Sequence, residues 1–171
     1  MSRAPEPGAG DERELLLGWL GYHRDALEAK CDGVSHDDLV RTGLGGSSMS
    51  LLGLVRHLTE MEHAYFRHAL GGVDRRADGE LDMVYGPYEE GRPEGDFDDL
   101  TPAMVDPSFE TWRQVRDEAD RLIAAPPSCD AVAPDRAWTL RRAVLKVLQE
   151  YARHNGHADL IRQSIDGATG E

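Results

Sequence analysis

Four residues in two segments of the chain have the types and spacing of a metal site. His57 lies within the apolar run LGLVRHLTEMEHAYF, where leucine and valine repeat at helical intervals. Glu150, His154 and His157 follow one another at offsets of four and three residues in the segment EYARHNGHADLIR. On a helix, these offsets place side chains on one face. The spacing therefore predicts a cluster in which His57 meets Glu150 and His154 across a helix interface.

Two neutral imidazoles and a carboxylate make a ligand set with an open face for a divalent ion. Zinc is the first choice, with nickel or iron as alternatives. A competing interpretation is that these residues form no metal site. Glu-x-x-x-His pairs are common by chance, and a core histidine is usually only hydrogen-bonded.

The other four histidines have weaker claims on a site. His36, His63 and His68 are predicted to lie on the surface. His23 either faces the cleft or is buried beside Tyr22, and its spacing does not separate these interpretations.

Four segments with helical periodicity are expected to position these residues. They cover about residues 11–31, 47–70, 107–125 and 138–165. Ser47 or Ser48 is expected to cap the second helix, because a serine oxygen accepts unpaired amide hydrogens of the first turn. Pro107 suits the first position of the third helix, with Asp106 as its cap. In the last helix, Gly156 costs ~1 kcal/mol relative to alanine, which predicts close packing against a neighbour or bound group.

The segment from Val73 to Asp106 is rich in Gly, Pro, Asp and Glu and shows no helical pattern. Loops of this length are commonly lids, binding loops or flexible segments. A mobile acidic surface loop is one interpretation. A lid is the other, with Met83, Tyr85, Tyr88 and Phe97 as the apolar residues that would cover a cleft. The chain is thus predicted to be an all-α, four-helix bundle with a long acidic loop between its second and third helices.

Length and composition indicate one folded domain over residues 11–171 after a disordered tail over residues 1–10. The formal net charge of −13 argues against nucleic acid and anionic membranes as partners. The tail lacks the apolar region of a signal peptide, and no apolar run approaches the ~18 residues of a membrane span. We therefore expect a cytoplasmic protein in which Cys31 and Cys129 are free thiols.

The segments MSLLGLVRHLTEMEHAYF and QEYARHNGHADLIRQSIDGATG resemble the DinB/YfiT-like superfamily of metal-dependent four-helix bundles. The resemblance extends over about residues 11–171 and points to a branch near mycothiol-dependent maleylpyruvate isomerases and thiol S-transferases. It implies a metal held by His57 from the second helix and by Glu150 and His154 from the last. It also implies a low-molecular-weight thiol such as mycothiol as co-substrate, a small-molecule substrate and a homodimer.

Two positions depart from that family pattern. Many relatives carry a histidine where this chain has Lys146, and a tryptophan where it has Arg142. The departures suggest an altered or lost site, or cations that bind an anionic substrate. Arg142 and Arg153 are the candidates for binding the co-substrate, since guanidinium pairs with a carboxylate in two hydrogen bonds. Arg162 is better explained as a surface charge.

The resulting hypothesis is a metal- and thiol-dependent transferase or isomerase. The metal lowers the pKa of a thiol, which then attacks an electrophilic carbon, and His157 orients a ligand or moves a proton. Two alternatives use the same residues. One is a metal-dependent hydrolase that uses bound water, which a thiol requirement would exclude. The other is a non-enzymatic small-molecule-binding or stress protein with a degenerate site, which metal-free protein would favour.

Overall fold

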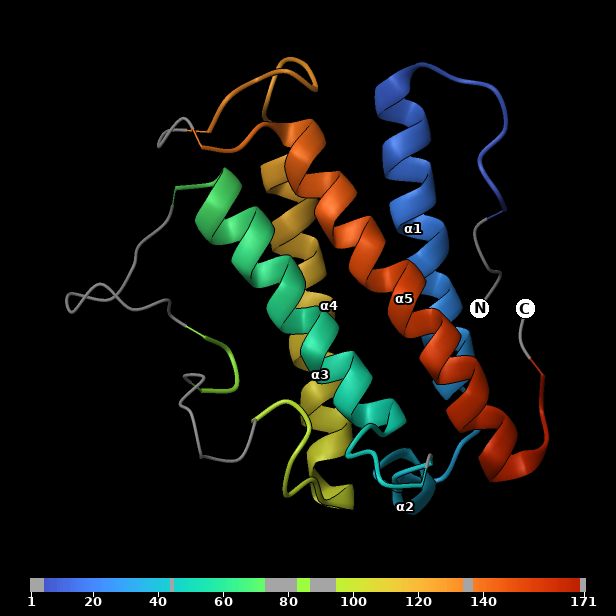
Figure 1. The fold of residues 1–171 in the computed structure, drawn as a ribbon. Helices are drawn as coiled ribbons and strands as arrows, with labels where there is room; N and C mark the ends of the chain where they lie inside the picture. Colours follow the sequence, from blue (N-terminus) through green and yellow to red (C-terminus); the bar gives the residue numbers. More distant parts are fainter. Residues whose placement is uncertain (1–4, 44, 73–82, 87–94, 134–136, 170–171) are drawn as a thin grey trace.

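The chain folds as a helical bundle (Figure 1). The computed structural model describes residues 5–43, 45–72, 83–86, 95–133 and 137–169. The long helices are α1 (Glu12–Cys31), α3 (Leu51–Glu62), α4 (Val105–Ala124) and α5 (Leu140–Asp166). α3 continues directly as a π-helix, η1 (His63–Leu70). The short elements are α2 (His36–Leu39) and the 3-10 helix η2 (Pro102–Met104).

The predicted all-α class is confirmed, because the described residues contain helices and one isolated β-bridge but no strand. None of the described helices is long and apolar enough to cross a membrane. Part of the predicted long loop, residues 73–82 and 87–94 with Tyr88 among them, lies outside the described residues. So do residues 1–4 of the predicted tail.

The directions of the helices explain why the connection between η1 and α4 is long. α1 and α5 run in one direction along the bundle, whereas α3 and α4 run in the other (Figure 1). The chain must therefore return along the bundle between the end of η1 and the start of α4. α4 has 20 residues and so is about 30 Å long at 1.5 Å per residue. Only a long crossover connection joins two parallel helices of this length.

Side chains cap the first turns of α1 and α3. The Asp11 carboxylate accepts the N–H of Glu14, and the Glu14 carboxylate accepts the N–H of Asp11. This reciprocal capping box satisfies two amides that have no partner within the helix. Ser50 caps α3, so the prediction of Ser47 or Ser48 was wrong. The helix begins later than the serine pattern suggested.

The start of α4 also differs from the prediction. The helix begins at Val105, directly after η2, so Pro107 and Asp106 both lie inside its first turn. A proline is tolerated there because first-turn N–H groups have no intrahelical acceptor. Asp106 therefore contributes favourable charge at the positive helix end rather than a cap.

Two arginines close the carboxyl ends of helices. Arg13 of α1 donates to carbonyl groups at the end of α4, at 2.6 and 2.7 Å. Arg162 of α5 donates to carbonyl groups at the end of α1, both at 2.9 Å. A cation at a helix carboxyl end satisfies free carbonyls and interacts favourably with the helix dipole. Arg162 therefore holds α1 against α5, so the prediction that it is only a surface charge was wrong.

A buried polar cluster joins the four long helices. Glu62 of α3 accepts two hydrogen bonds from Arg24 of α1, at 2.9 and 2.5 Å. It also accepts one from the Tyr151 hydroxyl of α5 at 2.6 Å. From α4, Asp120 accepts from Arg24 at 2.7 Å, and the Trp112 indole donates to Tyr151 at 3.0 Å. Each helix thus contributes a partner that satisfies a polar group in the core.

The charges in this cluster support one another. Burial opposes the charged form of Arg24, but the Glu62 carboxylate outweighs that effect and raises the pKa of the guanidinium. Burial raises the pKa of Tyr151, which therefore stays a neutral donor toward Glu62. The Arg24–Glu62 ion pair is favourable in the core only while both side chains are charged.

Gly156 does not pack closely against a neighbouring segment, so that part of the prediction was wrong. It lies on the exposed side of α5, and a Cβ built there would meet nothing within 4 Å. The close approach occurs instead at Gly53 of α3, where a Cβ would lie 2.7 Å from the Phe97 ring. Helical periodicity places a glycine on a helix, but only its neighbours in the fold show what it faces.

Replacing Glu62 by alanine would leave Arg24 buried without its bidentate partner. We expect a loss of about 3–5 kcal/mol in the free energy of unfolding, the usual cost of breaking a buried pair. Urea unfolding followed by circular dichroism measures this loss. Glu118→Ala is the matched control, because Glu118 pairs with Arg67 at partly exposed positions and should lose about 1 kcal/mol or less. Equal losses in both variants would contradict a central role for Glu62.

Candidate metal centre

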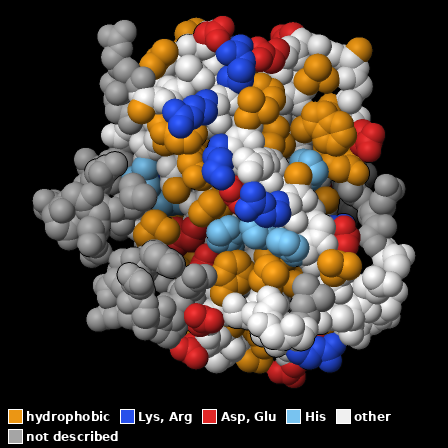
Figure 2. All heavy atoms as spheres, in the orientation of Figure 1, with side chains coloured by type: hydrophobic (Ala, Val, Ile, Leu, Met, Phe, Trp, Pro, Cys, Tyr) orange, Lys and Arg blue, Asp and Glu red, His pale blue; other side chains and the backbone are white. Residues whose placement is uncertain are grey.

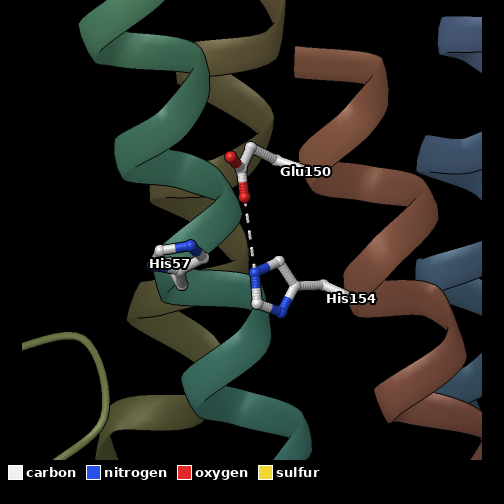
Figure 3. A group of neighbouring side chains, drawn as sticks. All are labelled: His57, Glu150 and His154. Carbon is white, nitrogen blue, oxygen red and sulfur yellow. Dashed lines mark ion pairs between the residues drawn. The ribbon is translucent and has the colours of Figure 1, made fainter. Parts of the chain in front are cut away.

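α3 and α5 bring His57, Glu150 and His154 together, and their side chains point toward one another (Figure 3). One candidate ligand atom from each residue lies within 4.8 Å of the other two. The two imidazole rings are 4.7 Å apart between centroids, and Nε2 of His154 lies 3.6 Å from Oε2 of Glu150. Ligand atoms around tetrahedral zinc are about 3.3–3.5 Å apart. Small side-chain movements would therefore complete the site.

Helical geometry and the buried cluster both contribute to this arrangement. Glu150 and His154 are one turn apart on α5, and both are buried. His57 precedes Glu62 on α3 by five residues, whereas His154 follows Tyr151 on α5 by three. Because the two helices run in opposite directions, the Tyr151–Glu62 hydrogen bond fixes the register in which His57 faces His154.

Among the described residues, this is the only group of three or more histidine, cysteine, aspartate or glutamate side chains close enough to share an ion. The predicted set is therefore the one that the fold assembles. Imidazole and carboxylate donors together suit zinc, nickel or iron better than magnesium or calcium, which prefer oxygen ligands alone.

His57 has a carboxylate partner that the sequence did not predict. Nδ1 of its ring lies 2.9 Å from Oδ2 of Asp96, and both side chains are 19% exposed. The ring of Phe97 lies 5.2 Å from that of His57. With Nδ1 held by Asp96, Nε2 is the nitrogen left for a ligand bond. A carboxylate behind a histidine fixes the ring and increases its basicity as a ligand.

The segment that carries Asp96 is fixed to α3 at several points. We call residues 83–86 and 95–101 the strap. The buried carboxylate of Glu60 accepts the N–H groups of Val84 and Tyr85, at 3.1 and 2.6 Å. Arg56 donates to the Gly95 carbonyl, and its guanidinium carbon lies 3.7 Å from the Tyr85 ring centroid. These contacts position Asp96, and no spacing in the sequence links it to His57.

The other two candidate ligands also have outer partners, both on α5. Lys146 donates a hydrogen bond to Oε1 of Glu150. Nδ1 of His154 lies 3.2 Å from Nδ1 of His157. Each of the three candidate ligands therefore has one donor atom toward the shared space and its second polar atom held by another residue. This pattern is typical of metal sites.

The charge states also suit a metal. Burial, followed by the neighbouring His57 and His157, lowers the pKa of His154 to about 4. Burial raises the pKa of Glu150, but the hydrogen bond and charge of Lys146 outweigh burial and lower it overall. At neutral pH, His154 is therefore neutral and Glu150 is anionic, and these are the forms that bind metal ions.

The two arginines predicted to bind a co-substrate lie at different distances from this cluster. Arg142 lies two turns before Glu150, where its guanidinium stacks on Trp138 at 3.9 Å and donates to the Ala137 carbonyl at 2.7 Å. Arg153 is exposed and lies within one turn of Glu150, whose pKa its charge helps to lower. Arg153 therefore lies at the edge of the cluster, whereas Arg142 lies two turns away from it toward the start of α5.

The remaining histidines lie outside the cluster. His36 is exposed, as predicted. His63 and His68 are partly buried on η1 with ring centroids 4.7 Å apart, so their surface prediction was incomplete. His23 is half-buried: its ring packs against that of Tyr22 at 5.6 Å, and its Nδ1 lies 3.3 Å from the side-chain amide of Asn155 on α5.

A family comparison completes the description of the chain. The model of the family described as mycothiol-S-transferase matches residues 15–167. The chain belongs to this family. The match includes every candidate site residue and confirms the resemblance seen in the sequence. No curated protein and no solved structure gave a match.

Titration of His154 should make the metal-free protein sensitive to acid. Its pKa of about 4 in the folded chain lies below its ordinary value of 6.5, so the unfolded chain binds the proton first as the pH falls. Stability should therefore decrease progressively from about pH 6.5 to pH 4, by up to about 3 kcal/mol. Urea unfolding across this range should show a shallower decrease for His154→Gln. Parallel curves for the two proteins would contradict the assigned cause.

Asp96→Asn should weaken metal binding, because an amide does not increase the basicity of His57 as a carboxylate does. We expect a loss of about 10–100-fold in metal affinity, measured by competition with a chromophoric chelator. Asp99→Asn is the matched control on the same strap, since Asp99 is exposed and its positive φ of 56° is tolerated by asparagine. A similar loss in both variants would indicate a general effect of negative charge.

Proposed function

We propose that the protein uses a divalent metal ion, with zinc as the first choice, to transfer mycothiol or a related thiol to a small electrophilic molecule. His57, Glu150 and His154 would hold the ion. The observation that carries the proposal is the convergence of these three side chains, each with an outer partner, in a chain of the mycothiol-S-transferase family. The family supports thiol transfer broadly, and the donor set supports the metal.

The roles of the residues follow from their contacts. When bound, the ion supplies a lowered pKa for the thiol that shares the site. His57 and His154 would provide neutral donors, and Glu150 one negative charge. Asp96 would fix the ring of His57, and Lys146 would hold the outer oxygen of Glu150. The chain's own residues thus provide a ligand set and keep it rigid.

His157 would act as a positioning residue. Nε2 of His154 faces Glu150, which leaves Nδ1 of His154 to carry the proton in the neutral ring. That N–H would donate to Nδ1 of His157, 3.2 Å away. This hydrogen bond selects the tautomer of His154 that binds a metal. The alternative role of His157 is to move a proton. With Nδ1 engaged by His154, only Nε2 of His157 would be available for that role.

The reaction forms a bond between the thiol sulfur and an electrophilic carbon. In a transfer, the leaving group departs with the bonding electron pair, and the thiol proton passes to solvent. In an isomerisation, the thiol adds and is expelled again after rotation about the substrate bond. The site residues need only hold and orient the thiol for either outcome.

The proposal includes a small-molecule substrate, a cytoplasmic location and a homodimer. The net charge of −13 supports a small molecule rather than nucleic acid or a membrane. Both cysteines are free thiols, which suits a reducing compartment. The homodimer rests on the family resemblance alone, and sedimentation equilibrium would test it.

Elemental analysis of the purified protein tests the metal site. We expect near-stoichiometric metal in wild type and its loss in both His57→Ala and His154→Ala, because two remaining ligands hold an ion weakly. His36→Ala is the control, since His36 is exposed and outside the cluster. Metal-free wild type, or metal retained in both ligand variants, would disprove the assignment.

An assay of the metal-loaded protein then tests the reaction. We expect conversion of an aryl chloride only when mycothiol is present, with chloride release equal to thioether formation. His57→Ala should abolish the conversion and His36→Ala should not. Conversion of esters or amides without any thiol would instead favour a hydrolase. Full metal content with neither activity would contradict thiol transfer and leave a metal-binding protein.

A further inference from the structure

We propose that the electrophilic substrate carries a carboxylate, which Lys146 and Arg153 hold on either side of Glu150. The inference rests on the proposed function, because it names the class of molecule that the thiol attacks. It adds a substrate-binding subsite next to the candidate metal ligands, made from two residues of one helix.

The charge along residues 142–157 of α5 is the reverse of the charge on the whole chain. The chain has a formal net charge of −13. On the face over α3 and α5, lysine, arginine and histidine side chains gather beside one another (Figure 2). From residue 142 to 157 of α5, three cationic side chains accompany a single carboxylate, in the order Arg142, Lys146, Glu150 and Arg153. A local positive region on an acidic protein attracts and orients anions.

The arginines of α5 divide into two kinds. Arg141 pairs with Glu12 and Asp130, and Arg162 pairs with Asp166. Arg142 and Arg153 have no carboxylate partner among the described residues, although aspartate and glutamate outnumber lysine and arginine by 32 to 19 in the chain. Pairing with carboxylates therefore accounts for Arg141 and Arg162 but not for Arg142 and Arg153. The unpaired arginines lie on the side of α5 that carries the candidate site.

Lys146 and Arg153 flank the candidate ligand Glu150. They lie four residues before it and three after it, and both offsets place side chains on the same face. Their Cα atoms are separated by about 10 Å along the helix. Lys146 uses one of its three N–H donors on Glu150 and has two left. Arg153 is exposed and forms no side-chain hydrogen bond or ion pair with another described residue. An anion lying over Glu150 would receive hydrogen bonds from both.

A carboxylate fits the donors of this pair. The planar guanidinium of Arg153 can hold a carboxylate through two parallel hydrogen bonds, and the ammonium of Lys146 supplies a compact positive charge beside it. Arg142 is held one turn above Lys146 by Trp138, so it strengthens the positive field without reaching the same group.

Paired substrates test this subsite. The probes are 4-chloro-3-nitrobenzoate and 4-chloro-3-nitrobenzamide, which react with mycothiol by sulfur–carbon bond formation and chloride loss, while the thiol proton passes to buffer. Each kcat/KM is divided by the uncatalysed rate constant for the same probe. We expect the wild type to prefer the acid by about tenfold, as for a charge-assisted pair. Arg153→Gln should reduce the preference close to one while its metal content stays at the wild-type level.

Arg121→Gln is the matched control, because Arg121 is an exposed arginine on α4. It should retain the full preference for the acid. Raising the ionic strength should reduce the preference in wild type, since the pair lies near solvent. Equal rates for acid and amide in wild type, or an unchanged preference in Arg153→Gln, would overturn the subsite while leaving thiol transfer intact.

Calorimetry separates this inference from the proposed function. 3-Nitrobenzoate and 3-nitrobenzamide are titrated into the metal-loaded protein without any thiol. Selective binding of the benzoate that is lost in Arg153→Gln and retained in Arg121→Gln supports the subsite. This conclusion holds even if the protein turns over neither chloride probe. The absence of turnover would contradict thiol transfer alone. Equal binding of the two probes to wild type overturns the subsite whether or not turnover occurs.

Discussion

The bundle depends on one buried carboxylate. Glu62 has no exposed surface, and an unpaired charge in that position would cost several kcal/mol. Arg24 of α1 and Tyr151 of α5 must therefore face it, and Asp120 of α4 completes the pairing of Arg24. Apolar side chains allow helices to slide and rotate by small amounts, whereas hydrogen bonds to one carboxylate do not. The cluster therefore selects one register for the four long helices.

The candidate metal centre uses that register. His57 and His154 lie within about two turns of the Glu62–Tyr151 hydrogen bond on the same pair of helices. The backbones beside them are held by this contact, so the two imidazoles meet at a defined distance. Preorganisation of this kind reduces the cost of bringing ligands together. The buried polar cluster and the candidate metal centre thus share one helix interface.

The connection between α3 and α4 contributes more than chain continuity. A parallel pair of helices requires a long return, and the strap uses that length to place Asp96 and Phe97 on His57. Its attachment to Glu60 and Arg56 leaves few free positions for Asp96. An acidic segment therefore supports the candidate ligands from one side, while the cationic residues of α5 line the other.

The sequence by itself determined the helical class, the grouping of Glu150 with His154, and the inward position of His57. Those features follow from the period of the α-helix, which relates residues within one segment. Only the tertiary structure decided that Asp96 supports His57 and that Gly156 faces outward. The reason is physical: these features depend on contacts between segments far apart in the chain and on the rotation of each helix in the bundle, and neither leaves a periodic trace in the sequence.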